Sequence, residues 1–312
     1  MPAPDVTSPK QVTVIGAGPA GLALGYELKK RKISCVILER GKAVADSWGA
    51  MPSQMRLLSP WKANRLPGSS DDGLRPNAQI SRAQYFAMLQ AYAQQHDLPI
   101  VTGAAVSNIC QAPAGIWHIE TSQGEFTSQL LVNATGYFSN PFTPIISGAD
   151  ATSIPQFHYA TYKSADSLKA ITGKTKPLVL VVGKRLSAGQ AIVELVEGGC
   201  SVALSHRGVL KFGSGPLGWW IFFRIHPWLE AQKLRRHGSM ARGVEIRMQG
   251  GKPTRWIKRG VVQTFPEILR FTDREVVFKN AQSLQPDAIL FATGFRPALQ
   301  HLASLKLSRD PG

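Results

Sequence analysis

The residues with the clearest chemistry form a glycine turn near the start of the chain, Gly16-Ala17-Gly18-Pro19-Ala20-Gly21. In a strand-turn-helix unit, Gly16 makes the tight turn, Gly18 lets the backbone approach a pyrophosphate, and Gly21 lets helix and strand pack closely. Pro19 suits the first helical turn, because its missing N–H removes no hydrogen bond there. The N–H groups and the helix dipole then favour a phosphate ester, so the turn predicts a dinucleotide-binding site.

The segments around this turn follow in the order that such a site needs. Residues 11–15 predict a buried strand ahead of the turn. Four apolar residues behind it have the spacing of a helix that buries one face: Ala20, Ala23, Leu24 and Leu28. Residues 34–38 predict the second strand, and Glu39 follows it where a carboxylate would bind ribose hydroxyls. Because a carboxylate repels a 2′-phosphate, this site favours FAD or NAD over NADP.

A second unit of like design begins after Pro177. It has an apolar strand over residues 178–182, the turn Gly183-Lys184-Arg185-Leu186-Ser187-Ala188-Gly189, and a helix predicted over residues 190–197. The next strand, residues 200–205, ends in Ser205-His206-Arg207. Arg207 stands where the first unit has an acid, and an arginine there can bind the 2′-phosphate of NADP. The alternative is that Arg207 is a solvated surface charge.

Small residues end two further strands. Residues 130–132 run into Ala134-Thr135-Gly136, and residues 288–291 run into Ala292-Thr293-Gly294. This repetition suggests that both segments cross between domains beside a cofactor.

The remaining segments predict a mixed fold. Residues 81–96 predict an amphipathic helix with Ser81 as its N-cap. Residues 104–109, 116–121 and 126–132 predict a small antiparallel excursion, and residues 261–265 and 275–278 resemble strands. Between Glu39 and residue 73 the helical pattern lapses. That segment, with Trp48 and Leu57-Leu58-Ser59-Pro60, could lie along a flat ring or form a surface loop with a buried tryptophan.

Bulk properties narrow the class of protein. The chain has 312 residues, 44% of them hydrophobic, and no apolar run of membrane-spanning length. The polar N-terminus does not resemble a signal peptide, so we expect a soluble cytoplasmic protein. A formal charge of +16 fits acidic cofactors, and with no nucleic-acid-binding motif we expect no nucleic-acid partner. Residues 219–228 carry Trp219 and Trp228 and fit a core helix, a substrate-channel wall or a peripheral membrane contact.

The cysteines indicate neither a redox pair nor a metal site. Cys35, Cys110 and Cys200 lie far apart in the sequence, which excludes a Cys-x-x-Cys pair and a cysteine cluster. We expect each of them to be a small buried apolar residue.

Taken together, these motifs resemble the flavin-containing monooxygenases and the plant YUCCA enzymes. The resemblance runs from about Gln11 to Leu299. Besides the two turns and the two Ala-Thr-Gly segments, it includes His158-Tyr159-Ala160-Thr161-Tyr162-Lys163-Ser164. His158 opens a family fingerprint, and Tyr162 matches these enzymes better than the Baeyer-Villiger enzymes, which usually have tryptophan there. The resemblance implies that NADPH reduces FAD, that oxygen adds at flavin C4a, and that the peroxyflavin oxygenates a nitrogen or sulfur centre.

The resemblance also implies site residues. Those expected to bind the two cofactors are Gly16, Gly18, Pro19, Ala20, Gly21, Glu39, Arg40, Trp48, Leu57, Leu58, Val106, Ala134, Thr135, Gly136, His158, Tyr162, Gly183, Arg185, Ser187, Ala188, Ser205, Arg207, Ala292, Thr293 and Gly294. Asn64 is the candidate for the catalytic asparagine of the family. Arg185 replaces the middle glycine of the second turn, where its side chain could hinder the pyrophosphate or pair with it. The chain stops at Gly312, where relatives continue through another flavin-contacting segment.

We therefore expect an α/β protein with two Rossmann-like three-layer dinucleotide-binding domains, the NADP domain being inserted into the FAD domain. The expected boundaries are residues 1–150 for the first part of the FAD domain, 151–285 for the NADP domain, and 286–312 for the return. The expected function is an NADPH-dependent flavin monooxygenase acting with O2 on a small nucleophilic substrate. The alternatives are an NAD(P)H oxidase or reductase without productive oxygenation, and a non-catalytic flavin- or nucleotide-binding protein.

Overall fold

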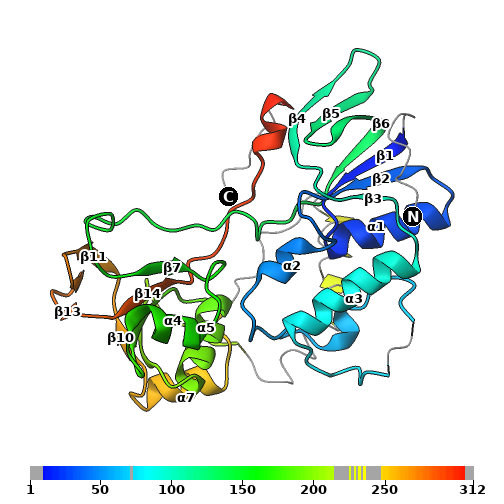
Figure 1. Cartoon of the computed structure of the whole chain (residues 1–312). Helices are drawn as coiled ribbons and strands as arrows, with labels where there is room; N and C mark the ends of the chain where they lie inside the picture. The colour runs from blue at the N-terminus through cyan, green and yellow to red at the C-terminus, as the bar shows by residue number, and fades with distance from the viewer. Residues whose placement is uncertain are drawn as a thin grey trace. The chain divides into compact units, whose positions relative to one another are not determined.

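The computed structural model describes residues 10–70, 73–213 and 247–305, together with Ile225, Trp228, Leu229, Ala231, Gln232, Arg235 and Arg236. Its chain divides into two compact units (Figure 1). Unit 1 comprises Met1–Met51, Arg56–Asn140 and Phe295–Gly312, and unit 2 comprises Pro52–Met55 and Pro141–Gly294.

Unit 1 is built on a six-stranded sheet with the order β3-β2-β1-β6-β5-β4. Its strands are β1 Lys10–Ile15, β2 Cys35–Leu38, β3 Ile100–Val101, β4 Val106–Gln111, β5 Trp117–Thr121 and β6 Gly124–Asn133. Strands β3, β2, β1 and β6 are parallel, whereas β4, β5 and β6 form an antiparallel meander. The structure thus confirms the parallel sheet and the antiparallel excursion that the sequence predicts.

Helices cover one face of the parallel strands, and on their other face side chains pack with those of the meander. The helical elements of unit 1 are α1 Pro19–Lys30, α2 Asp46–Ala50, η1 Trp61–Ala63, α3 Arg82–Gln95 and η2 Gln300–Leu305. Val12 and Val14 pack with Leu22 of α1 and Leu89 of α3. On the opposite face, residues of β1 and β2 pack with residues of β4, β5 and β6, and with Leu302 of η2, which lies beside β4 (Figure 1). Ser81 caps α3 as predicted, in a capping box with Gln84.

The predicted buried face of the first helix was only partly right, because Leu28 is buried and Ala23 and Leu24 are half-buried. The buried residues of α1 are Gly21, Leu22, Gly25 and Leu28, whereas Ala20 is exposed. A Cβ on Gly21 would lie 1.9 Å from the Gly16 carbonyl oxygen, and one on Gly25 would lie 2.5 Å from Ile37 Cδ1. The helix therefore packs through these glycines as well as through Leu22 and Leu28. The contact at Gly21 is the close packing that the sequence predicts, whereas a pattern of apolar side chains does not reveal the contact at Gly25.

Unit 2 contains a five-stranded parallel sheet with the order β10-β9-β8-β14-β7. Its strands are β7 Gln156–His158, β8 Leu178–Val182, β9 Ser201–Ser205, β10 Gln263–Phe265 and β14 Ala288–Phe291. A second, antiparallel sheet consists of β11 Ile268–Phe271, β12 Val276–Phe278 and β13 Ser283–Leu284. The helices of unit 2 that the structure describes in full are α4 Ala165–Thr172, α5 Leu186–Glu197 and α7 Lys252–Lys258.

Unit 2 has three layers because successive residues of its central strands point to opposite faces. Val179 and Val181 of β8 pack against the helices α4, α5 and α7. Leu180, between them, packs with residues of the small antiparallel sheet. The central strands are therefore buried on both faces, as expected of near-continuous apolar runs in a parallel sheet.

Several elements of unit 2 differ from the prediction. Helix α5 begins at Leu186, four residues before the predicted start, because the turn ahead of it is only three residues long and Arg185 is its N-cap. Helices α4 and α7 and strands β7, β11 and β13 were not predicted. The predicted strand over residues 275–278 is β12, which belongs to the antiparallel sheet.

Two expectations from composition had different outcomes. Cys35 and Cys200 are buried, but Cys110 is exposed, because it follows the buried Ile109 on β4 and points to the other side of the strand.

In the described part of the chain, no helix has the length and hydropathy needed to cross a membrane. Most of the aromatic stretch 219–228 lies outside the described residues, although Trp228 is among them and is exposed.

A buried polar contact ties α5 to the segment before α4. The Tyr162 hydroxyl donates a hydrogen bond of 3.1 Å to Glu194 Oε1, and the Tyr162 ring stacks on Tyr159 at 6.2 Å between centroids. Burial raises the pKa of Glu194 to about 7, and the hydrogen bond from Tyr162 opposes part of that rise. The charge of this carboxyl group therefore changes near neutral pH.

We predict that Gly21→Ala destabilises the fold by about 2–3 kcal/mol, because its Cβ would collide with backbone that cannot turn away. Gly18→Ala is the matched control, since a Cβ there would meet nothing within 4 Å. Urea unfolding of the two FAD-free variants and of wild type measures the difference. Equal stability of the two variants would contradict the close packing at Gly21.

We also predict that Glu194→Gln gains stability relative to wild type as the pH rises from about 5 to about 8. The raised pKa means that native Glu194 holds a proton that the unfolded chain has released above its ordinary value of 4.5, so wild type loses stability as the pH rises toward 7. Glutamine still accepts the Tyr162 hydrogen bond and carries no charge. Urea unfolding across this range tests the prediction.

The control for that experiment is Glu197→Gln, on the same helix. Glu197 is half exposed and pairs with Lys252. Its substitution removes an exposed charge from the same helix and should change the free energy of unfolding by no more than about 1 kcal/mol. A Glu194→Gln profile parallel to that of wild type would show that Glu194 has no shifted pKa.

Candidate functional site

In unit 1, strand register brings the predicted residues to one edge of the sheet. Ile15 at the end of β1 pairs with Leu38 of β2 and with Asn133 of β6. The residues that follow these three strand ends are Gly16, Glu39 and Ala134. They meet at the carboxyl edge, where open α/β sheets bind their ligands.

Position 16 requires a glycine because the backbone there lies very close to the backbone of Ala134. Its φ is +105°, its N–H donates to the Leu38 carbonyl oxygen at 2.7 Å, and a Cβ there would lie 2.6 Å from the Ala134 carbonyl oxygen. Ala134 in turn donates its N–H to the Ile15 carbonyl oxygen at 2.8 Å. The small Ala134-Thr135-Gly136 segment therefore packs directly on the glycine turn.

The N-terminus of α1 fits a phosphate group. Gly18 is its N-cap, no side chain caps it, and Pro19 stands in its first turn. A Cβ built on Gly18 would point into space with no protein atom within 4 Å. The position thus leaves room for a ligand to approach backbone N–H groups at the positive end of the helix dipole.

Glu39 is fixed beside this turn by the turn itself. Its Oε2 accepts a hydrogen bond of 2.9 Å from the Ala17 N–H, and its Oε1 accepts one of 2.8 Å from the Gly41 N–H. Each carboxylate oxygen has a further lone pair that could accept from a ribose hydroxyl. Arg40 is exposed next to it. Thr135 adds a buried hydroxyl with no hydrogen-bond partner within the described residues.

The other predicted residues of unit 1 have varied surroundings. Trp48 on α2 is half-buried and packs edge-on against Tyr85, with ring centroids 4.7 Å apart. Leu57 is buried, Leu58 is half-buried, and Val106 is half-buried at the start of β4.

Asn64 uses its amide group within its own loop. Its Nδ2 donates to the carbonyl oxygens of Ser59 and Pro60 at 3.3 and 2.9 Å, and its Oδ1 accepts from Ser59 Oγ at 2.8 Å. These contacts close the loop that holds η1. They give Asn64 a structural role in unit 1.

Unit 2 repeats the same backbone arrangement. Gly183 has a φ of +152°, donates its N–H to the Ser205 carbonyl oxygen at 3.0 Å, and would place a Cβ 2.4 Å from the Ala292 carbonyl oxygen. Ala188, at the position corresponding to Gly21, is fully buried. The second glycine turn therefore packs on Ala292-Thr293-Gly294 as the first packs on Ala134-Thr135-Gly136.

Charged residues distinguish the second turn from the first. Arg185 is exposed and extended at the N-terminus of α5, so its guanidinium can approach a pyrophosphate there. Ser187 is half-buried in the first turn of α5. Ser205 is buried, and its hydroxyl donates to the Pro266 carbonyl oxygen at 2.8 Å. Arg207 is exposed, and its Nη1 lies 3.8 Å from Glu267 Oε1.

His158 is a structural link in unit 2. The Ala160 N–H donates to its Nδ1 at 3.0 Å, so its Nε2 carries the proton and donates to the Gly294 carbonyl oxygen, also at 3.0 Å. Burial lowers the pKa of the imidazole, an effect that the Gly294 hydrogen bond partly offsets. Thr293 donates its hydroxyl to the Phe142 carbonyl oxygen. Tyr162 is buried and bonded to Glu194, so it can affect the turn only by positioning α5.

Two charged residues near the second turn were not among the predicted site residues. Glu267 follows the end of β10 by two residues, as Arg207 follows the end of β9. This equal distance from the end of a strand is the sequence signal from which Glu267 could have been predicted. Lys184, inside the turn, lies close to the backbone that follows Arg207. A Cβ built on Gly208 would lie 4.0 Å from the Nζ atom of Lys184.

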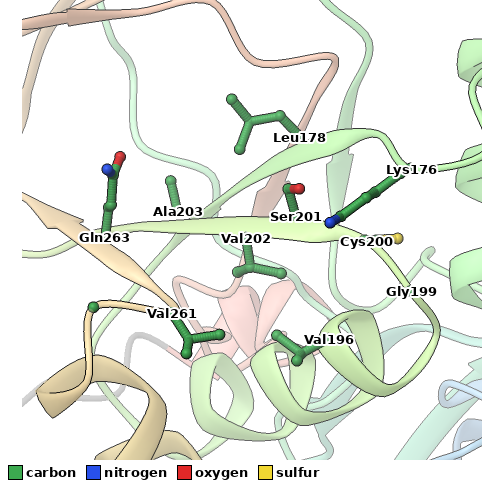
Figure 2. A pocket seen from close by; sticks show the side chains of 11 residues that line it. Lys176, Leu178, Val196, Gly199, Cys200, Ser201, Val202, Ala203, Val261 and Gln263 are labelled. Atoms are coloured by element: carbon green, nitrogen blue, oxygen red, sulfur yellow. The ribbon is translucent and has the colours of Figure 1, made fainter.

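A cavity of about 550 Å³ lies at the opposite end of the same sheet. It is lined by Lys176, Cys200, Val261 and Gln263 among others, which come from the amino ends of β8, β9 and β10 (Figure 2). It is therefore separate from the glycine turn, which lies at the carboxyl ends. Within the described residues, no group of three or more His, Cys, Asp or Glu side chains could hold a metal ion.

Known proteins resemble this chain along most of its length. An uncharacterized oxidoreductase named CzcO, from Bacillus subtilis, is 28% identical over 92% of this chain and 81% of its own. The probable indole-3-pyruvate monooxygenase YUCCA1 of Arabidopsis thaliana is 26% identical over 91% of this chain and 75% of its own. These likenesses confirm the resemblance as distant homology.

A solved structure shares the fold. The flavin-containing monooxygenase from Stenotrophomonas maltophilia superposes with a TM-score of 0.78 at 23% identity, covering 96% of this chain and 83% of that one. The family model for pyridine nucleotide-disulphide oxidoreductases matches residues 13–311, and membership of that family implies binding of FAD and NAD(P)H. The chain is a flavin-dependent oxidoreductase that belongs to the pyridine nucleotide-disulphide oxidoreductase family.

Proposed function

We propose that this protein is an FAD-dependent, NADPH-consuming monooxygenase that oxygenates a small nitrogen- or sulfur-containing substrate. The observation that carries the proposal is the repeated packing of a glycine turn on an Ala-Thr-Gly segment, once in each unit. Two such edges in one chain suit two dinucleotides, as the transfer of a hydride from one to the other requires.

FAD is assigned to unit 1. The N-terminus of α1 at Gly18 suits the pyrophosphate, and Glu39, held by the Ala17 and Gly41 N–H groups, suits the ribose hydroxyls. The unpaired hydroxyl of Thr135 is a further group available to the cofactor. The domain assignment that follows is FAD with unit 1 and NADPH with unit 2, whose sheet includes β14.

NADPH is assigned to unit 2 on the basis of charge. Arg185 at the start of α5 suits the pyrophosphate, and Arg207 after β9 suits the 2′-phosphate. An acid at the position of Arg207 would instead favour NADH. When bound, FAD supplies hydride acceptance and oxygen activation, and the residues of this chain bind and orient it.

Two observations favour oxygenation over disulfide reduction. Homologous relatives are named as indole-3-pyruvate monooxygenases. In this chain the cysteines have no arrangement for a dithiol relay, because Cys35 and Cys200 are buried in different units and Cys110 is exposed on β4. The oxygenated substrate is therefore proposed to be a soft nucleophile such as an amine, a sulfide or an indolic acid.

We predict that Gly18→Ala weakens FAD binding by at least about tenfold while leaving the FAD-free fold intact. The added methyl group would occupy the space that the pyrophosphate needs, yet it contacts no protein atom within 4 Å. Quenching of flavin fluorescence on titration with the apoprotein measures the affinity. Unchanged affinity in the variant would exclude the N-terminus of α1 as the pyrophosphate site.

We predict that the FAD-loaded protein, given NADPH and air, converts an aryl methyl sulfide, a tertiary amine or an indolic acid into an oxygenated product. Product and hydrogen peroxide are each measured against NADPH consumed. Peroxide equal to the NADPH consumed, without any oxygenated product, would instead favour the oxidase alternative. Failure of NADPH to bleach the bound flavin under anaerobic conditions would favour the non-catalytic alternative.

A further inference from the structure

The carboxyl ends of β9 and β10 place two opposite charges side by side. Phe265 pairs with Ser205 in the parallel register. Beyond that pair, the His206 N–H donates to the Phe265 carbonyl oxygen at 3.1 Å, and Ser205 Oγ donates to the Pro266 carbonyl oxygen at 2.8 Å. This backbone framework sets Glu267 next to Arg207.

Glu267 is one carboxylate among several cations. Its Oε1 lies 3.8 Å from Arg207 Nη1, and its Oε2 lies 2.5 Å from Lys279 Nζ. The Lys279 N–H also donates to the Glu267 carbonyl oxygen at 3.0 Å, which holds the two residues together. Lys184 lies near Gly208, directly after Arg207. The cationic edge proposed for the 2′-phosphate therefore contains an acid of its own.

The two nucleotides would meet this acid differently. The 2′-phosphate of NADPH carries close to two negative charges, which a nearby carboxylate repels, whereas the 2′-hydroxyl of NADH is a donor that a carboxylate accepts. Arg207 and Lys279 could also bind the phosphate only by leaving Glu267. Their side chains are 71% and 59% exposed, so these pairs are weak and can open.

We propose that Glu267 is a specificity-determining residue that limits the preference of unit 2 for NADPH over NADH. It competes with the 2′-phosphate for Arg207 and Lys279, and it offers an acceptor to the 2′-hydroxyl. This inference rests on the proposed placement of the pyridine nucleotide at the carboxyl edge of the unit 2 sheet. It assigns the discrimination between NADPH and NADH to the residues that follow β10 as well as to those that follow β9.

The experiment compares adenosine 2′,5′-bisphosphate with 5′-AMP, which differ only in the 2′-phosphate. Calorimetric titration of the FAD-loaded full chain gives both dissociation constants for wild type, Glu267→Gln and Glu197→Gln. Glu267→Gln should tighten binding of the bisphosphate about tenfold, since two exposed ion pairs no longer compete, and should leave 5′-AMP binding unchanged or weaker. The gain should shrink at high salt.

Glu197→Gln is the control because it removes one negative charge from the same unit, on α5 beside Lys252. It should alter neither affinity by more than about twofold. Lys279→Met is a second, independent variant. It removes a cation but leaves Glu267 in place, so it should weaken bisphosphate binding.

The outcomes are distinct. Bisphosphate affinity that stays constant or falls in Glu267→Gln would overturn the inference, because Glu267 would then be neutral or would position Arg207. Arg207→Gln tests the site itself. Unchanged bisphosphate affinity in that variant would show that the 2′-phosphate does not bind at this edge of the sheet. If neither nucleotide binds to wild type or to any variant, the proposed function fails along with the inference.

Discussion

The arrangement of both candidate sites depends on one close contact between backbones. At Gly16 and again at Gly183, the chain turns so tightly against the carbonyl of the alanine that follows a neighbouring strand that a Cβ would lie 2.6 or 2.4 Å from its oxygen. Both glycines have positive φ values, which disfavour any residue with a side chain. This contact sets where α1 and α5 begin. It thereby aims the positive end of each helix dipole at the carboxyl edge of its sheet.

The two edges share their backbone but differ in charge. Glu39 follows β2 and is held by two backbone N–H groups, so it is an acceptor of fixed position. Arg207 follows β9 on a long, exposed side chain. A fixed carboxylate selects hydroxyl groups through geometry, whereas a flexible guanidinium attracts phosphate mainly through charge. We infer that cofactor choice depends on side chains such as Glu39 and Arg207, which can be substituted without changing the glycine turns.

The sequence predicted the parallel strands and turns well because their signals are local. An apolar run such as residues 178–182, followed at once by glycine, fits few structures other than a buried strand that ends in a turn. The buried face of α1 was only partly right, because Gly21 and Gly25 lie on it beside Leu22 and Leu28, and a glycine has no apolar side chain for a periodic pattern to detect. Strands β7, β11 and β13 have two to four residues, too few for a period to show. Glu39 accepts from the backbone N–H groups of Ala17 and Gly41, and Asn64 binds Ser59 and Pro60, contacts that residue spacing alone does not reveal.

The groups with shifted pKa values serve the scaffold. His158 is locked as the Nε2–H tautomer between Ala160 and Gly294, so neither ring nitrogen can exchange a proton without breaking a bond that holds the second Ala-Thr-Gly segment. Glu194 and Tyr162 likewise bind each other and fasten α5. Since they stabilise structure, the redox chemistry must come from the cofactors that the family binds, and the protein's own contribution is to hold and orient them.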